Sequence, residues 1–124
     1  MGRKVIVVDD SKSVRQQLAI VLGEAGYNVV QAEDGSDGLD KVKGNRDASL
    51  MICDVNMPKM NGIELLEALT KEGITPGLPV VMLTTEDQPD LIARAKKNGA
   101  KGWIVKPFES SELIEAVKML DGAP

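Results

Sequence analysis

Several residue types that serve common functions are missing from this sequence or rare in it. It contains no histidine, so the chain cannot itself donate a phosphoryl group from a phosphohistidine. The single cysteine, Cys53, cannot form an intramolecular disulfide, which is typical of proteins in a reducing compartment, and we expect it to be a small buried residue on a strand. One Trp, one Tyr and one Phe offer no stacking platform for nucleic-acid bases.

The charges and the apolar runs exclude further classes. The chain has 15 basic and 19 acidic residues, and its basic residues form no cluster, so we expect no nucleic-acid partner. No apolar stretch is long enough to cross a membrane, and the run after the basic N-terminus is too short for a signal peptide. We therefore expect a cytoplasmic protein with no membrane contact. Its 124 residues suit one domain over residues 1–124, with no second folded unit.

The apolar pattern predicts an α/β fold. Short apolar runs alternate about five times with amphipathic stretches, as in a doubly wound parallel sheet with helices on both faces. Strands are predicted over residues 4–9, 27–32, 49–54, 79–84 and 102–106. Helices are predicted from the Ser11 cap to the stop at Gly26, over 36–43, after the Asn61 cap with Glu64 as its capping-box partner, over 88–98 before Gly99, and from about Ser110, where Leu113, Ile114, Val117 and Leu120 are expected to be buried.

Four of the five predicted strands end on functional groups. Asp9 and Asp10 follow the first apolar run, and Asp54, Thr84 and Lys106 end the third, fourth and fifth strands. The carboxyl ends of parallel strands meet at the edge where open α/β sheets bind ligands. Clustered carboxylates suit Mg²⁺, and a hydroxyl with an ammonium group suits phosphoryl oxygens. The pattern predicts phosphoryl transfer, with the isolated Asp54 as the nucleophile that forms an aspartyl phosphate.

The same residues, in this order and spacing, resemble the receiver domains of bacterial two-component response regulators over essentially the whole chain. The resemblance lies in Asp9-Asp10, in the segment from Asp54 to Gly62, in Thr84 and in Lys106-Pro107-Phe108. Within the family, the stand-alone chemotaxis regulators of the CheY type share the Asn-Met-Pro loop and have no attached output domain. The resemblance implies a flavodoxin-like fold with five strands in the order 2-1-3-4-5, as known for this family.

The resemblance also implies a role for each residue of the acidic site. Asp54 would be the phosphoacceptor. Asp10, Asp54 and the backbone carbonyl of Asn56 would bind Mg²⁺ directly, and Asp9 would act mainly through water. Lys106 would pair with the phosphoryl group.

A second set of residues would respond to phosphorylation. By resemblance, Thr84 would donate its hydroxyl to the phosphoryl group, and Trp103, where the family usually has Tyr or Phe, would turn inward as the second half of a two-state switch. Asn56 and Glu86 would tune hydrolysis of the acyl phosphate. The peptide bond from Lys106 to Pro107 would be cis.

The resemblance implies protein partners for a monomeric receiver. A CheA-like sensor histidine kinase would donate the phosphoryl group, a downstream protein such as a flagellar motor switch protein would receive the signal, and a phosphatase is a further candidate partner. A phosphorelay shuttle and a receiver cut from a longer regulator remain open alternatives.

Two other classes fit the sequence less well. A metal-dependent phosphohydrolase of the haloacid-dehalogenase type needs Asp-x-Asp and a cap, whereas here the acids are adjacent and no segment is long enough for a cap. A flavin or dinucleotide binder needs a Gly-rich phosphate loop where this chain has Asp-Asp-Ser-Lys-Ser.

Overall fold

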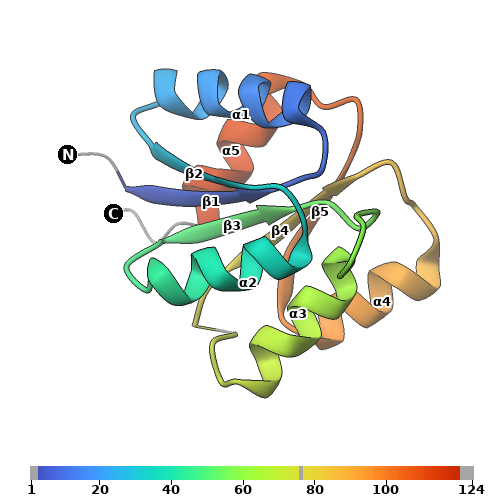
Figure 1. Ribbon diagram of the computed structural model, residues 1–124. Coiled ribbons are helices and arrows are strands. Elements are labelled where there is room, and N and C mark those ends of the chain that lie inside the picture. The colour runs from blue at the N-terminus through green and yellow to red at the C-terminus, as the bar shows by residue number, and fades with distance from the viewer. Residues whose placement is uncertain (1–2, 76, 121–124) are drawn as a thin grey trace.

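The computed structural model describes residues 3–75 and 77–120 as one sheet with helices on both faces (Figure 1). The strands are β1 (Lys4–Val8), β2 (Asn28–Ala32), β3 (Leu50–Cys53), β4 (Val80–Thr84) and β5 (Ala100–Val105). The helices are α1 (Lys12–Glu24), α2 (Gly35–Gly44), α3 (Gly62–Lys71), α4 (Pro89–Lys97) and α5 (Ser110–Leu120). The strands pair in parallel in the order β2-β1-β3-β4-β5, which confirms the predicted flavodoxin-like fold.

Each face of the sheet is covered by its own layer of helices. In Figure 1, α1 and α5 lie on one face, and α2, α3 and α4 lie on the other. Along β1, Val5 and Val7 pack into the first layer, whereas Ile6 and Val8 pack into the second. Because successive side chains of a strand point to opposite faces, a central strand covered on both sides must be apolar throughout.

The functional residues lie just beyond the strand ends. Three predicted strands end one residue earlier than expected, at Val8, Cys53 and Val105, so Asp9, Asp54 and Lys106 are the first residues of the loops that follow. Beyond the end of a strand, successive side chains no longer have to alternate between the two faces of the sheet. The side chains of Asp9, Asp54 and Lys106 can therefore turn toward one another.

Other boundaries differ at the margins of the sheet and in the last helix. Strand β5 begins at Ala100, two residues before the predicted start, because it continues to pair with β4 through a register shift between Val80 and Val81. In α5, Leu113 and Val117 are buried as expected, but Ile114 and Leu120 are only partly buried.

Residues 1–2, 76 and 121–124, which include both limits of the predicted domain, lie outside the described residues.

The predicted helix caps are confirmed. The Ser11 hydroxyl accepts a hydrogen bond from the backbone N–H of Val14, and Asn61 and Glu64 form a complete capping box at the start of α3. Among the helices of residues 3–75 and 77–120, none combines the length and the apolar character needed to cross a membrane.

Candidate functional site

Three carboxylates meet at the carboxyl edge of the sheet. Asp9 and Asp10 follow β1, and Asp54 follows β3, the strand that pairs with β1. Each of the three residues offers a carboxylate oxygen, and these oxygens all lie within 4.8 Å of one another. Asp9 and Asp54 are only 2% and 7% exposed, whereas Asp10 is open to solvent. The adjacency of β1 and β3 therefore creates the predicted acidic cluster.

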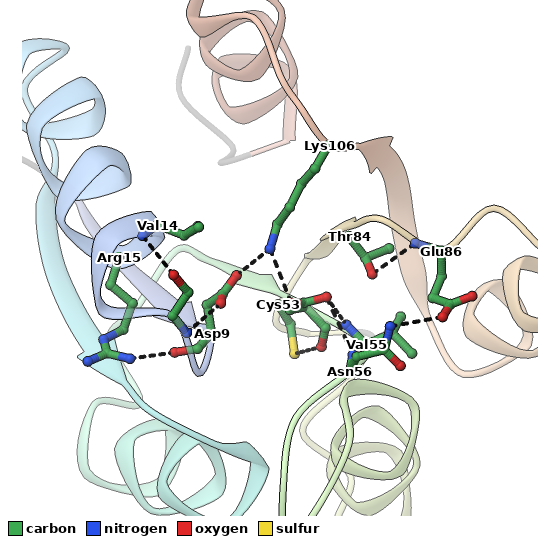
Figure 2. A network of polar contacts seen from close by, with 11 residues as sticks. Asp9, Val14, Arg15, Cys53, Val55, Asn56, Thr84, Glu86 and Lys106 are labelled. Carbon is green, nitrogen blue, oxygen red and sulfur yellow. Dashed lines mark hydrogen bonds and ion pairs between the residues drawn. The ribbon is translucent and has the colours of Figure 1, made fainter.

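Lys106 extends into this cluster from the end of β5 (Figure 2). Its ammonium nitrogen lies 2.8 Å from Asp9 Oδ2 and 3.1 Å from Asp54 Oδ2. Burial raises the pKa of Asp9, and this effect outweighs the opposing hydrogen bonds from Lys106 and the Ser11 backbone. Burial lowers the pKa of Lys106, but the hydrogen bonds to Asp9 and the charges of both acids outweigh it, so the net pKa is raised and Lys106 stays charged.

The Asp54 carboxylate is oriented by the backbone that follows it. Its Oδ1 accepts a hydrogen bond of 2.7 Å from the N–H of Val55 and a longer one of 3.4 Å from that of Asn56. The loop then turns back so closely that a Cβ atom on Gly62 would lie 2.0 Å from the Asp54 carbonyl oxygen. Only glycine, which has no Cβ atom, can occupy position 62 at this short distance. The sequence did not reveal this requirement. Cys53 is buried beneath the site, as expected.

Glu86 connects the residues on the β4 side of the site. Its backbone N–H donates to the Thr84 hydroxyl at 3.2 Å, and its carboxylate accepts a hydrogen bond of 2.9 Å from the Asn56 side chain (Figure 2). Its backbone carbonyl accepts a hydrogen bond of 2.8 Å from the indole nitrogen of Trp103. The structure thus joins four predicted residues through the loop after β4. The Lys106–Pro107 bond is cis, as the resemblance implied.

Arg15, in α1, was not anticipated from the sequence. Its Nη1 donates a hydrogen bond of 2.6 Å to the backbone carbonyl of Asp9, and its Nε donates one of 3.2 Å to the side chain of Gln31 in β2. An arginine five residues after an acidic pair is the only signal in the sequence, and it does not show which atom the guanidinium contacts.

Comparison with known proteins identifies the class to which this fold and site belong. The family model for the response regulator receiver domain matches residues 5–118, so the chain belongs to that family. It is 35% identical to chemotaxis protein CheY1 of Helicobacter pylori over 120 residues, 96% of this chain and 97% of the relative. The chain is therefore a CheY-like signalling protein rather than a classical enzyme, and its acidic triad is typical of the Mg²⁺ site of receivers.

Solved structures support the same assignment. Chemotaxis protein CheY4 of Vibrio cholerae superposes with a TM-score of 0.89 at 39% identity, covering 97% of this chain and 99% of that one. CheY in a CheX–CheY–BeF3–Mg²⁺ complex from Borrelia burgdorferi superposes with a TM-score of 0.88 at 28% identity, covering 94% and 87%.

Proposed function

We propose that Asp54 accepts a phosphoryl group from the phosphohistidine of a sensor histidine kinase in a Mg²⁺-dependent reaction, and that the phosphorylated chain changes its affinity for a chemotaxis partner. The observation that carries this proposal is the placement of Asp54 beside two further carboxylates and within hydrogen-bond distance of the Lys106 ammonium. Receiver domains of this family take phosphate from histidine kinases.

The proposed transfer uses the groups already in place. A carboxylate oxygen of Asp54 attacks the phosphorus, the new P–O bond forms as the P–N bond to the donor imidazole breaks, and the imidazole nitrogen keeps the electron pair. Lys106, already hydrogen-bonded to Asp54, pairs with a phosphoryl oxygen. Backbone bonds from Val55 and Asn56 keep the Asp54 carboxylate oriented during the attack.

The donor set fits Mg²⁺. Three carboxylates beside one ammonium leave excess negative charge at the site, and hard oxygen ligands are those that Mg²⁺ prefers. Asp10, Asp54 and the Asn56 carbonyl would bind the ion directly, and Asp9, whose carboxylate is already bonded to Lys106 and Ser11, would act through water. When bound, the ion neutralises charge that develops on the transferring phosphoryl oxygens.

We propose that Thr84 and Trp103 transmit phosphorylation to the surface, which their shared hydrogen bonds with Glu86 support. The Thr84 hydroxyl accepts from the Glu86 N–H, which leaves its own hydrogen free to donate to a phosphoryl oxygen. Movement of Thr84 toward that oxygen breaks its bond with Glu86, whose carbonyl holds the Trp103 indole. We propose that Trp103 changes its environment in response. Its fluorescence should change when BeF3⁻ is added to the Mg²⁺-loaded protein, and an unchanged spectrum would remove Trp103 from the switch.

Asn56 and Glu86 form a pair near the proposed phosphoacceptor, two residues beyond Asp54 and Thr84. Their solvent-exposed hydrogen bond joins the loops after β3 and β4. We propose that this pair tunes the lifetime of the phosphorylated state. Asn56→Ala should change the first-order rate of dephosphorylation while leaving the rate of phosphorylation by acetyl phosphate within about twofold of wild type; equal lifetimes would remove the pair from this role.

Chemotaxis is the pathway that the relatives favour over a general phosphorelay. CheY1 of Helicobacter pylori and CheY4 of Vibrio cholerae are chemotaxis proteins, and both match this chain over nearly its whole length. We therefore propose a CheA-like kinase as donor and a flagellar motor switch protein as target. The Borrelia burgdorferi relative forms a complex with CheX, which supports a further protein partner for this chain.

The phosphoacceptor is tested by intact mass after incubation with acetyl phosphate. Wild type should gain one phosphoryl group with Mg²⁺ and none with EDTA, and Asp54→Asn should gain none. Asp40→Asn, an exposed position on α2, is the matched control and should behave as wild type. A phosphoryl adduct on Asp54→Asn at the wild-type rate would show that another residue is the acceptor.

The pathway is tested separately with purified partners. Phosphorylated CheA should transfer its phosphoryl group to wild type within seconds to minutes and not to Asp54→Asn, and BeF3⁻ with Mg²⁺ should strengthen binding to a motor switch protein. Phosphorylation by acetyl phosphate without transfer from CheA, or without a change in binding, would place this receiver in another pathway.

A further inference from the structure

The acidic pair after β1 is anchored through Asp9 rather than through Asp10. The backbone N–H of Asp9 donates to the Ala32 carbonyl at 3.1 Å, and its carboxylate accepts hydrogen bonds from the Ser11 N–H at 2.9 Å and from Lys106 at 2.8 Å. Within residues 3–75 and 77–120, the Asp10 side chain forms no hydrogen bond or ion pair. Its position therefore depends on the backbone that carries it.

Arg15 bonds to the part of Asp9 that determines where Asp10 begins. The carbonyl of Asp9 and the N–H of Asp10 belong to one planar peptide unit, so fixing the carbonyl fixes the direction in which the chain enters Asp10. The guanidinium donates to this carbonyl at 2.6 Å, and its Nε is anchored on Gln31 of the neighbouring strand β2 at 3.2 Å. Arg15 thus links α1, the turn after β1 and the edge strand through one rigid group.

The guanidinium bonds to a neutral carbonyl although carboxylates lie nearby. Among the described residues, Arg15 has no ion pair within 4.0 Å, so it does not occupy the oxygens of Asp9 or Asp10. A positive charge near a cation site weakens cation binding by repulsion, whereas fixing a ligand in place strengthens it. These two effects have opposite signs, so they can be separated by experiment.

We propose that Arg15 is a positioning residue for the divalent-cation site: it holds the Asp9–Asp10 peptide so that the otherwise unsupported Asp10 carboxylate faces Asp54. This inference rests on the proposed function, because it assumes that Asp10 and Asp54 share a cation. Residues that hold a metal ligand from behind commonly change metal affinity by about 10–100-fold.

The test measures cation affinity and backbone order without relying on phosphorylation. Free Mn²⁺ is counted by electron paramagnetic resonance during titration of the unphosphorylated protein, with Mg²⁺ as competitor, because Mn²⁺ accepts the same octahedral oxygen ligands. Arg15→Met removes the charge and the donors, and Arg15→Lys keeps the charge but loses the fork that reaches two acceptors. Gln31→Ala keeps the guanidinium and removes only its second anchor. Arg46→Met, an exposed position in the loop before β3, is the control for loss of one positive charge.

We expect Arg15→Met to weaken Mn²⁺ binding about tenfold and Arg15→Lys and Gln31→Ala to weaken it by smaller factors. The control Arg46→Met should bind at least as tightly as wild type. Amide order parameters from ¹⁵N relaxation should fall at Asp10 in Arg15→Lys while those of β1 stay unchanged, which a general loss of stability would not produce.

Two results would overturn the proposal for Arg15 alone, and a third would overturn the cation site on which it rests. Tighter binding by Arg15→Met than by wild type, with unchanged binding by Arg15→Lys, would show that the guanidinium acts only as a charge. An unchanged order parameter at Asp10 in both Arg15 variants would show that it does not hold the peptide. The reference variant Asp10→Asn should bind Mn²⁺ far more weakly than wild type. If it binds equally well, the cation site assumed in the proposed function is wrong, and the proposal for Arg15 fails with it.

Discussion

Neutralising Asp10 should have opposite effects on stability with and without Mg²⁺. In the metal-free protein, the Asp10 carboxylate lies within 4.8 Å of two other carboxylates. At this distance each repulsion costs about 1 kcal/mol in a water-like dielectric, which suits an exposed side chain. Lys106, whose ammonium group contacts the same two carboxylates, attracts Asp10 from a similar distance and offsets about half of the total of about 2 kcal/mol. Because no hydrogen bond of Asp10 is lost among the described residues, Asp10→Asn should raise the free energy of unfolding by about 1 kcal/mol.

With Mg²⁺ the order should reverse. A ligand that binds only the folded state at 100 times its Kd adds about 2.7 kcal/mol to the free energy of unfolding. A variant with affinity lowered about a hundredfold gains only about 0.4 kcal/mol at the same concentration. Wild type should therefore become more stable than Asp10→Asn by about 1 kcal/mol.

Urea unfolding in EDTA and in excess Mg²⁺ measures both effects on the same proteins. Asp40→Asn, with the same loss of charge on an exposed helix position, should show neither the gain in EDTA nor a reduced response to Mg²⁺. If Asp10→Asn is less stable than wild type in EDTA, carboxylate repulsion does not dominate the site. If it gains as much from Mg²⁺ as wild type, Asp10 is not a ligand.

Three further predictions concern other parts of the fold. Gly62→Ala should lower the free energy of unfolding by about 3 kcal/mol because its Cβ would lie 2.0 Å from a backbone oxygen. The control Gly23→Ala, whose Cβ would have no atom within 4 Å, should not destabilise the protein, and equal effects of the two variants in urea unfolding would contradict the close approach at Gly62. The hydrogen bond from Lys41 lowers the pKa of Asp37, so this pair stabilises the fold above pH 3.8, and its contribution is lost as the pH falls through the lowered pKa. Lys41→Met should therefore make the free energy of unfolding fall less steeply at acidic pH, and an unchanged slope would argue against the pair. Burial raises the pKa of the Cys53 thiol, so iodoacetamide should modify it only after unfolding, and rapid labelling of the native protein would refute its burial.

Much of the fold was readable from local pattern. A parallel strand covered on both faces must be apolar throughout, so Val5 to Val8 and Val80 to Leu83 stand out as uninterrupted runs. The caps at Ser11 and Asn61 were also readable, because a cap depends on residues only three positions apart. The exact ends of the strands were harder to read from the sequence. Strand β5 starts early, at Ala100, because of a register shift against β4 that no local pattern contains.

The residues of the site could be named from the sequence, but most of their contacts could not. The order of acids, hydroxyl and lysine at the strand ends, together with the family resemblance, was enough to single out Asp54 and Lys106. The sequence did not show that Lys106 hydrogen-bonds both Asp9 and Asp54, since these residues are far apart along the chain. Nor did it show why position 62 must be glycine, which depends on how closely the loop returns to β3.

By itself, the sequence determined which side chains lie at the carboxyl ends of the strands, because hydrophobic periodicity and strand direction are local properties. Only the tertiary structure decided which of them touch. The pairing of β1 with β3 brings the acids together, and the loop after β4 joins Glu86 to Asn56 and Trp103. The packing of α1 beside β2 brings Arg15 to the Asp9 carbonyl. The physical reason is that hydrogen bonds form between atoms about 3 Å apart, and the approach of distant segments to that distance is determined by the packing of the whole domain.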